Sequence, residues 1–395
     1  MNKKSIRDIE LTGKRALVRV DFNVPLDPES NAIGDDSRIR AVIPTIEYLV
    51  DKGCKVILCS HLGRPKGKVV GELRLAPVAK RLSELLEQPV AAADDCIGPE
   101  VEEAVSRLKE GDILLLENLR FHAEEEKNDP EFAKSLSRLA DVYINDAFGT
   151  AHRAHASTAG IARYLPAVAG FLMEKEIDFL GKALTEPSHP FAAITGGAKV
   201  SDKLALLENI ISKVDFMLIG GGMCCTFLKA QGYSVGKSMV EEDKLDFTLK
   251  LLDKAAKANV KLMLPGDVVV AESFAGGVPC QTVSVSEIPE SSYVMDIGPG
   301  TIDEFAAGIR KCRTVIWNGP MGVFEYAEFR HGTEAIAREL AALEATTILG
   351  GGSTAEAVDE LGLADRMSHV STGGGAALEF LEGKTLPGVE VLQDK

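Results

Sequence analysis

The sequence lacks the features that would place the protein in or across a membrane. No uninterrupted apolar stretch reaches the roughly 18 residues that a membrane-spanning helix needs. Residues 1–8 contain basic side chains but no apolar core behind them, which does not fit a secretory signal peptide. We therefore expect a cytoplasmic protein with no membrane partner.

The cysteines lack the spacing of a metal-binding or redox motif. The seven cysteines lie at positions 54, 59, 96, 224, 225, 280 and 312, and none forms a Cys-x-x-Cys pair. Several sit in apolar runs, as Cys59 does after Val56, Ile57 and Leu58. We expect reduced, buried thiols that behave as small hydrophobic side chains, with metal ligation or disulfides as the alternative.

An excess of basic residues is also missing. The formal net charge is −15, so a general nucleic-acid binder or membrane-surface binder is not expected. The arginines are unevenly distributed, however, with 13 before residue 171 and five after it. Because arginine makes flat bidentate contacts with carboxylates and phosphates, this distribution indicates an anion site in the first half.

The length and composition fit two globular domains. Of the 395 residues, 45% are hydrophobic and 26% are charged. Short apolar runs alternate with segments of helical spacing, which is typical of parallel sheets covered on both faces. The apolar runs are residues 16–20, 56–59, 113–116 and 142–144, then 191–194, 216–219, 261–264, 314–317 and 346–349; helical segments include 75–86, 131–140, 204–211 and 243–258.

These two series predict an α/β protein with two doubly wound, Rossmann-like domains. The domains are expected over residues 1–170 and 189–380, with a connecting helix over 171–188. No low-complexity linker separates them in the sequence. We therefore expect the two parallel sheets to face each other across a cleft.

The loops after the predicted strands are where ligands are expected, because open parallel sheets bind them beyond the carboxyl ends of the strands. In the first half, three of the four loops contain an arginine and three contain a histidine; the loops are residues 21–23, 60–64, 117–122 and 145–153. His61, His122 and His152 are thus loop candidates, whereas His189, His331 and His369 are expected to be structural.

The corresponding loops of the second half are rich in glycine. They are residues 195–199, 220–222, 318–320, 350–353 and 373–375. Glycine between a strand and a helix lets backbone amides approach an anion, although a single such loop is as often only a tight turn. Several in one domain favour a polyphosphate ligand.

Two familiar nucleotide motifs do not fit well. Residues 232–238 resemble a P-loop but have three residues between the glycines where four are required, so we interpret them as a surface loop. Gly350, Gly352 and Ala355 fit the degenerate dinucleotide pattern, which keeps an NAD-dependent oxidoreductase as an alternative.

An arginine-rich site and a glycine-rich nucleotide site together predict phosphoryl transfer to a compact acidic substrate. This chemistry needs alignment and charge neutralisation, with no covalent nucleophile from the protein. If the acceptor is a carboxylate, no general base is needed either.

Seven segments, in this order, resemble the motifs of the phosphoglycerate kinase family. They are residues 17–25, 60–65, 117–122, 145–155, 196–203, 317–325 and 371–376. Their order and spacing are highly specific, and the resemblance runs nearly the whole length of the chain. It implies reversible transfer between 1,3-bisphosphoglycerate with ADP and 3-phosphoglycerate with ATP, in glycolysis or gluconeogenesis.

The resemblance assigns 3-phosphoglycerate to the first domain. The implied binding residues are Asp21, Phe22, Asn23, Arg38, His61, Leu62, Gly63, Arg64, Arg120 and Arg153. The implied catalytic set is Arg38, which neutralises the acyl-phosphate oxygen, Lys199, which follows the migrating phosphoryl group, and the glycines Gly352 and Gly375.

The nucleotide, with Mg²⁺, is assigned to the second domain by the same resemblance. Lys203 contacts its phosphates and Glu325 its ribose hydroxyls; Gly221, Gly222, Asn318 and Val323 border the nucleoside, and Gly351, Gly352, Ser353 and Thr354, with Gly374 and Gly375, surround the phosphates. Family members close by a hinge motion, so the expected cleft is a hinged one. Residues 381–395 are expected to pack back on the first domain.

Ser353 departs from the family pattern. The family has an Asp here that binds the magnesium of the nucleotide, so no protein ligand for the metal is assigned in this chain. A serine offers no charge to a hard cation, and we expect magnesium to bind through nucleotide oxygens and water. Ser353 and Glu356 also fit a capping box, which predicts a helix from Thr354 to Leu361 with Ser353 as its cap.

The expected partners are the two phosphoglycerates and ATP or ADP, with no nucleic acid, and the expected oligomeric state is a monomer. An inactive nucleotide-binding homologue stays open as a further alternative because of Ser353.

Overall fold

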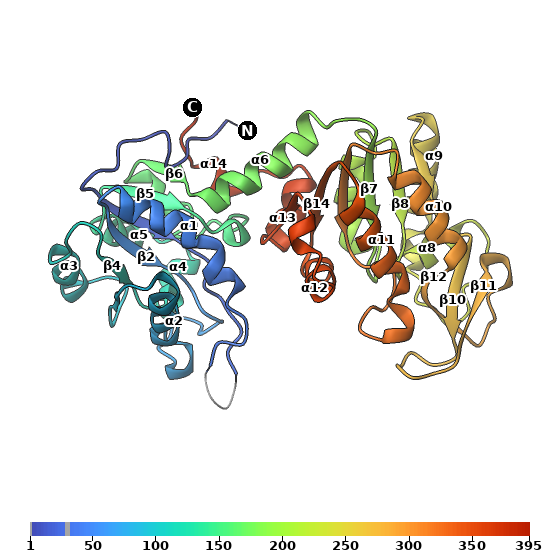
Figure 1. Ribbon diagram of the computed structural model, residues 1–395, viewed down its shortest axis with the longest axis horizontal. Helices are drawn as coiled ribbons and strands as arrows, with labels where there is room; N and C mark the ends of the chain where they lie inside the picture. Colours follow the sequence, from blue (N-terminus) through green and yellow to red (C-terminus); the bar gives the residue numbers. More distant parts are fainter. Residues whose placement is uncertain (1, 28–31) are drawn as a thin grey trace. The chain divides into compact units, whose positions relative to one another are not determined.

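The computed structural model of the protein describes residues 2–27 and 32–395. The chain divides into two compact units. In Figure 1 the first is coloured blue to green apart from its red C-terminal segment, and the second is coloured green to red. Unit 1 comprises Met1–Asp178 and Thr385–Lys395, and unit 2 comprises Phe179–Lys384.

Unit 1 is built on a six-stranded parallel sheet with strand order β3-β4-β2-β1-β5-β6. The strands are β1 (Arg15–Arg19), β2 (Lys55–Cys59), β3 (Val90–Ala92), β4 (Ile113–Leu115), β5 (Val142–Asn145) and β6 (Ala167–Ala169). The last four residues of β1 and of β2 are all buried, which requires cover on both faces of the sheet.

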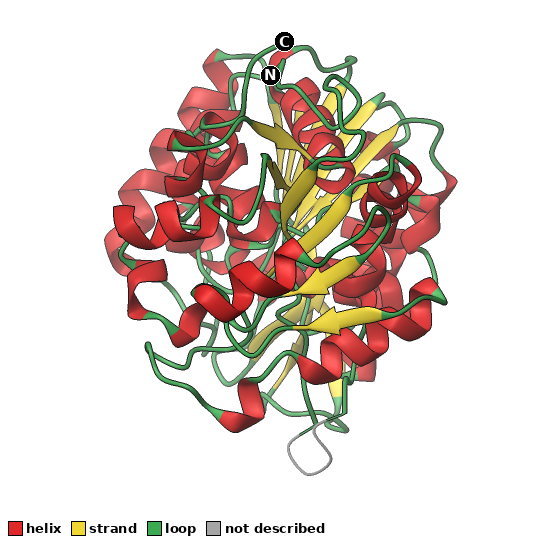
Figure 2. Ribbon diagram, turned by 90° about the vertical axis from the view of Figure 1, so that its left-hand side faces the viewer, coloured by secondary structure: helices red, strands yellow, loops and turns green. Residues whose placement is uncertain are grey.

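Helices provide that cover, as the red ribbons beside the yellow strands show in Figure 2. In unit 1 they are α1 (Ser37–Asp51), α2 (Ala76–Leu86), α3 (Pro99–Ser106), α4 (Ala123–Glu126), α5 (Pro130–Ser137) and α14 (Pro387–Glu390). Helix α6 (Phe171–Thr185) contains the boundary between the two units, and Asp146 Oδ1 accepts hydrogen bonds from Leu172 N and Met173 N in its first turn.

Unit 2 contains a second six-stranded parallel sheet, with strand order β15-β14-β13-β7-β8-β9. The strands are β7 (Phe191–Thr195), β8 (Phe216–Ile219), β9 (Lys261–Met263), β13 (Thr314–Asn318), β14 (Thr346–Gly350) and β15 (His369–Val370). The helices are α7 (Leu204–Ile210), α8 (Cys224–Ala230), α9 (Leu245–Lys257), α10 (Pro299–Ile309), α11 (His331–Ala342), α12 (Gly352–Glu360) and α13 (Gly375–Leu381).

The prediction of two parallel-sheet α/β domains is confirmed, and each of the nine predicted apolar runs forms a parallel strand. A three-stranded antiparallel sheet in unit 2 was not predicted. Its strands are β10 (Asp267–Ala271), β11 (Cys280–Ser284) and β12 (Tyr293–Ile297), in the order β11-β10-β12.

The segment Thr385–Lys395 belongs to unit 1, where its backbone extends the pairing of the first residues and of β6. Lys4 N donates to Gln393 O at 2.8 Å, and Gln393 N donates to Ala167 O at 2.9 Å. Leu386, Val389 and Leu392 are buried there.

All seven cysteines are free, and six of them are buried as expected, whereas Cys280 on strand β11 is exposed. Within the described ranges, no helix combines the length and the apolar character that crossing a bilayer requires.

Candidate active site

The carboxyl ends of four neighbouring strands in unit 1 gather the predicted substrate residues. Strands β4, β2, β1 and β5 are consecutive in the sheet, so the loops that follow them meet at one edge. Asp21 and Asn23 follow β1, His61 follows β2, Arg120 follows β4, and Arg153 lies in the loop after β5.

His61 lies at the centre of this edge and is 4% exposed. Its Nδ1 is 3.1 Å from Nη2 of Arg19. Burial, followed by the charges of Arg19, Arg120, Arg153 and Arg38, holds the pKa of His61 well below its usual range. The imidazole is therefore neutral, and four guanidinium groups lie within electrostatic reach of one buried side chain.

Hydrogen bonds connect the loops after β1 and β2. Gly63 N donates to Asn23 Oδ1 at 2.8 Å, and Phe22 N donates to Ser60 Oγ at 2.9 Å. Arg38, in the first turn of α1, donates to Asp21 Oδ2 at 3.0 Å. These contacts fix both the backbone and one guanidinium group of the predicted site.

Arg120 is 4% exposed and only partly satisfied. Its Nη1 donates to Gly63 O at 2.9 Å, whereas its Nε, although 3.3 Å from Glu126 Oε1, makes no hydrogen bond. Burial lowers the pKa of Arg120, but a guanidinium group remains charged at neutral pH. A buried guanidinium nitrogen that makes no hydrogen bond is a feature that an anionic ligand would complete.

Arg64 and Leu62, both predicted, are less closely tied to this cluster than Arg153 is. Arg64 is exposed and makes no ion pair within residues 2–27 and 32–395. Leu62 is buried and its backbone is held by Asn118, because Leu62 N donates to Asn118 Oδ1 and Asn118 Nδ2 donates to Leu62 O. Arg153 donates from Nε to His152 Nε2 at 3.2 Å.

Arg19 and its buried partners were missed from the sequence. Arg19 is 1% exposed and donates from Nε to Ser157 Oγ at 3.0 Å, and that hydroxyl donates to Glu125 Oε1 at 2.5 Å. Burial raises the pKa of Glu125, although the charge of Arg19 acts in the opposite direction. The available signal was an arginine at the end of an otherwise apolar strand, since a buried charge needs a partner.

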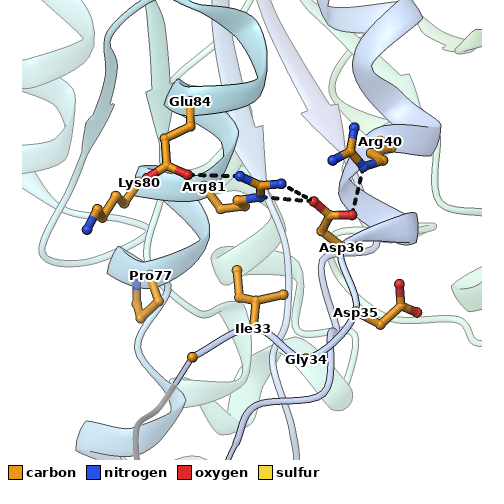
Figure 3. Close-up of a pocket in the computed structure, with 10 residues that line it drawn as sticks. Ile33, Gly34, Asp35, Asp36, Arg40, Pro77, Lys80, Arg81 and Glu84 are labelled. Atoms are coloured by element: carbon orange, nitrogen blue, oxygen red, sulfur yellow. Dashed lines mark hydrogen bonds and ion pairs between the residues drawn. The ribbon is translucent and has the colours of Figure 1, made fainter.

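A separate cavity of unit 1, of about 680 Å³, lies between the start of α1 and α2 and has a different character. Figure 3 shows Arg81 bonded to Asp36 and Glu84, with Arg40 bonded to Asp36 as well. The cavity is lined by three basic and three acidic side chains, so it offers no net positive charge to an anion.

Glycine-rich turns follow the central strands of the unit 2 sheet. The backbones of these turns approach one another closely: a Cβ on Gly319, whose φ is +101°, would lie 2.3 Å from Gly196 O. Gly352, Gly374 and Gly375 differ, because no atom lies within 4 Å of a Cβ built on them. Gly375 begins α13 and Gly352 begins α12, so both leave open space at a helix start.

Two adjoining cavities lie along these turns and share Gly197, Ala198, Pro320 and Ser353. The larger, of about 530 Å³, is lined by apolar side chains that include Phe274, Tyr293, Val294 and Met295, together with the predicted residues Gly221, Gly222, Val323 and Glu325. The smaller, of about 190 Å³, is lined by Lys199, Lys203, Asn318, Gly351, Gly352, Ser353 and Thr354, all of which were predicted.

Lys203 and Asn318 lie together in the smaller cavity. Lys203 Nζ donates to Asn318 Oδ1, and burial lowers the pKa of this lysine to about 8. Asn318 is 1% exposed, yet its Nδ2 has no hydrogen-bond partner in the described part of the chain. Lys199 is exposed at the rim. The cavity therefore offers positive charge and an unused donor to an anion.

The apolar wall of the larger cavity was not predicted. It comes mostly from strand β12 and from Phe274 after β10, and these belong to the unpredicted antiparallel sheet. Residues 232–238 form a loop with several exposed positions, as expected, and Lys237 and Ser238 of this loop also line the cavity. The sequence signal for this wall was an aromatic residue, Phe274, beside a Gly-rich segment. In the structure Phe274 is 58% exposed.

The predicted capping role of Ser353 is wrong. Helix α12 begins at Gly352 with Gly351 as its N-cap, and no side chain caps it. Ser353 thus lies inside the first turn and is exposed, because Gly351, with a φ of +93°, is the N-cap and the helix begins two residues earlier than expected. The neighbouring Thr354 is buried, and its Oγ1 accepts a hydrogen bond from Gly319 N at 2.7 Å.

The smaller cavity suits a divalent cation that arrives with a nucleotide. Hard cations such as Mg²⁺ prefer oxygen ligands and keep several waters. Among the residues that line this cavity, Asp202 is the one carboxylate and Ser353 adds an exposed hydroxyl. These groups fit a cation that is held mainly by phosphate oxygens and water.

Similarity to known proteins agrees with the fold. The family model described as phosphoglycerate kinase matches residues 6–384. Phosphoglycerate kinases of Moorella thermoacetica and Pelotomaculum thermopropionicum are 59% and 58% identical over 395 residues, with each chain fully covered. The solved structure of phosphoglycerate kinase from Coxiella burnetii matches with a TM-score of 0.91 at 42% identity, over 98% of each chain.

The fold and these similarities together define a kinase, an enzyme that transfers phosphoryl groups. They give no support to an NAD-dependent oxidoreductase. More particularly, the chain belongs to the phosphoglycerate kinase family.

Proposed function

We propose that the protein transfers a phosphoryl group reversibly between 1,3-bisphosphoglycerate with ADP and 3-phosphoglycerate with ATP, as a step of glycolysis and gluconeogenesis. The observation that carries this proposal is the convergence of Arg19, Arg38, Arg120 and Arg153 on the neutral His61. A compact ligand with a carboxylate and a phosphate is the kind of substrate that such a cluster binds.

The acidic substrate binds at the carboxyl ends of the central strands in the unit 1 sheet. Arg120 offers its unused Nε, and Arg38 is fixed by Asp21 within the first turn of α1. Arg153 and the exposed Arg64 add charge, while Asn23 and the loop of His61, Leu62 and Gly63 shape the backbone. His61 accepts or donates a hydrogen bond without adding charge, because its pKa is low.

The nucleotide binds along the two cavities of unit 2. The apolar walls of the larger cavity suit an adenine base, with Glu325 at the ribose. The phosphates lie in the smaller cavity, where Lys203, Asn318 Nδ2 and the amides of Gly351 and Gly352 can contact them. Gly374 and Gly375, at the start of α13, extend this phosphate region.

The chemistry requires charge neutralisation more than proton transfer. In the direction of ATP use, a carboxylate oxygen of 3-phosphoglycerate bonds to the γ-phosphorus as the bond from that phosphorus to the ADP oxygen breaks, and no proton moves. Arg38 neutralises the acceptor oxygens, and the exposed Lys199 follows the transferred group. Lys203 stays with the phosphates of the nucleotide.

Magnesium is the divalent cation that we propose for this reaction, bound with ATP or ADP, where it neutralises phosphate charge. Among the residues that line the smaller cavity, Asp202 offers a carboxylate and Ser353 a hydroxyl to this cation. Because serine stands where the family has Asp, we expect the enzyme to need more magnesium than a member with the carboxylate.

The substitution Ser353→Asp tests this expectation. The added carboxylate should lower the magnesium concentration that gives half-maximal turnover. Ser353→Asn, whose side chain is similar in size to aspartate but uncharged, should not lower this concentration. An unchanged magnesium dependence in Ser353→Asp would rule out the altered metal dependence while leaving the reaction itself untouched.

Ligand titration tests the assignment of the two sites. Calorimetry with ATP and with NADH should give binding for ATP alone, and 3-phosphoglycerate should bind to wild type but much more weakly to Arg120→Ala. Binding of NADH in place of ATP would contradict the proposal. The cytoplasmic location, the monomeric state and the absence of nucleic-acid partners stay predictions from the sequence.

A further inference from the structure

A second group of metal-ligating side chains lies outside the proposed active site, in unit 1. Within residues 2–27 and 32–395, Asp95, Cys96 and His122 form the one group of three or more His, Cys, Asp or Glu side chains that could hold a metal ion. One donor atom from each lies within 4.8 Å of the others. The proposed kinase chemistry uses none of the three.

The carboxylate of Asp95 joins the group. Its Oδ1 lies 2.6 Å from His122 Nε2 and accepts a hydrogen bond from Cys96 N at 2.6 Å. The Cys96 sulfur lies within 4.8 Å of the donor atoms of Asp95 and His122. The carboxylate of Asp95 therefore already lies beside both of the other potential ligand atoms.

Two separate segments are held together at this point. Asp95 and Cys96 follow strand β3, and His122 precedes α4. Glu117 N donates to Asp95 O at 3.2 Å, and the His122 ring packs against Phe132 with centroids 5.3 Å apart. The donor atoms are thus positioned by neighbours in the fold, which lowers the cost of bringing them around an ion.

Burial differs among the three side chains in a way that suits a bound cation. Cys96 is fully buried, whereas the side chains of His122 and Asp95 are 27% and 50% exposed. A cation can therefore reach the group from the solvent side and meet the sulfur at the back. Asp, His and Cys are ligands of Zn²⁺, and three protein ligands with one open position are a common arrangement for it.

We propose that Asp95, Cys96 and His122 form a site for a divalent transition metal of the Zn²⁺ type, separate from the cation that accompanies the nucleotide. The metal binds between Asp95 Oδ1, His122 Nε2 and Cys96 Sγ. The Cys96 thiol loses its proton to solvent, and the neutral His122 ring that binds the metal carries its single proton on Nδ1. A water molecule completes the tetrahedron.

The site would also act on the segment that carries Arg120. That residue lies in the short turn Leu119–Phe121, which begins at Asn118, whose Oδ1 accepts a hydrogen bond from Arg120 N. His122 follows the turn directly. A metal on His122 would therefore hold the turn at its other end.

Cobalt is a suitable probe because it replaces zinc and its bond to a thiolate absorbs in the near ultraviolet. The full chain, freed of metal with a chelator, is titrated with Co²⁺ in the absence of nucleotide. We expect a sulfur-to-cobalt band that saturates at one ion per chain and disappears on addition of Zn²⁺.

Two cysteine variants locate the band. Cys96→Ser should abolish it, and Cys280→Ser, which removes the exposed thiol in unit 2, should leave it unchanged. Should Cys96→Ser fold poorly, His122→Gln serves instead: it keeps the thiol and should weaken cobalt binding by more than the 10- to 100-fold that loss of an outer-shell partner costs.

Absence of the band in the wild-type chain would overturn the proposal, as would a band that persists in Cys96→Ser. Equal cobalt affinity of wild type and His122→Gln would also overturn it. None of these readouts involves turnover, so the result is independent of the proposed kinase reaction.

Discussion

His61 allows four arginines to gather around one buried side chain. The ring is neutral, since burial and the surrounding guanidinium charges keep the pKa of His61 low. It therefore separates the positive side chains without adding a further charge. The mutual repulsion that remains is relieved only in part by Asp21, Glu125 and Glu126, and an anionic substrate would complete the neutralisation.

Arg38 is the residue whose removal should affect turnover most selectively. We expect Arg38→Ala to reduce kcat by about 10³-fold or more, the range known for arginines that neutralise charge in phosphoryl transfer. Stability should change little, because the side chain is 41% exposed and exposed ion pairs contribute about 0–1 kcal/mol. Steady-state kinetics and thermal unfolding check both statements.

Arg40 provides the matched control for that variant. It lies on the same helix, is exposed, and pairs with Asp36 away from the arginine cluster. Arg40→Ala should keep wild-type kinetics. Equal losses of kcat in Arg38→Ala and Arg40→Ala would mean that the first turn of α1 matters only for folding.

Lys203 should make nucleotide affinity depend on pH. Its pKa is lowered to about 8, so the side chain is charged below that pH and becomes neutral above it. Phosphates prefer the charged form, and ADP affinity should therefore fall as pH rises above 8, by at most about tenfold per pH unit. Calorimetric titration with ADP from pH 7 to pH 9.5 measures this.

Lys203→Arg separates this effect from other titrations. A guanidinium group stays charged throughout that range, so the fall in ADP affinity should be lost in the variant. The same pH profile in wild type and Lys203→Arg would show that another group is responsible.

The single residues of the site were predictable to different degrees. Loop residues such as Asp21, His61 and Lys203 could be named because they follow apolar strands and match a family pattern. The apolar pattern of its strand did not identify Arg19 as a residue of the site. Its role depends on Ser157 and Glu125, which lie more than 100 positions away in the sequence.

At the scale of the elements, the turns of the nucleotide sheet contain glycines with two different roles. A Cβ on Gly319 would clash with backbone at 2.3 Å, whereas one on Gly352 would meet open space. The first glycine is needed for folding of the turn. The second leaves room for a ligand.

Two alanine substitutions should separate these roles. Gly319→Ala should destabilise the protein by about 1–3 kcal/mol through strain and overlap. Gly352→Ala should leave stability within about 0.5 kcal/mol but weaken ADP binding, because the methyl group fills space at the start of α12. Chemical denaturation and ADP titration measure the two quantities. Similar behaviour of both variants would refute the distinction.

Nine of the twelve parallel strands in the described part of the chain were predictable from sequence, because each contains a continuous apolar run, whereas the short strands β3, β6 and β15 were missed. The antiparallel sheet was also missed. Strand β11 is exposed over most of its length and forms no apolar run, whereas β10 contains one, residues 268–271, that we did not interpret as a strand. The Ser353 cap failed for a local reason: its sequence pattern is sound, but the positive φ of Gly351 starts the helix earlier.

At the scale of the whole molecule, each unit provides one half of the proposed chemistry. The arginine cluster belongs entirely to unit 1, and both nucleotide cavities belong entirely to unit 2. Binding experiments therefore report on one unit at a time. Transfer of the phosphoryl group requires both ligands in one complex, so only turnover tests the two halves together.

The most direct test is the formation of ADP from ATP by the full chain, with excess magnesium, in the presence and absence of 3-phosphoglycerate. We expect ADP formation that depends on 3-phosphoglycerate, at a rate on the order of 1–100 per second, as is usual for kinases. No ADP formation above the rate without 3-phosphoglycerate would contradict the account and would favour an inactive nucleotide-binding homologue.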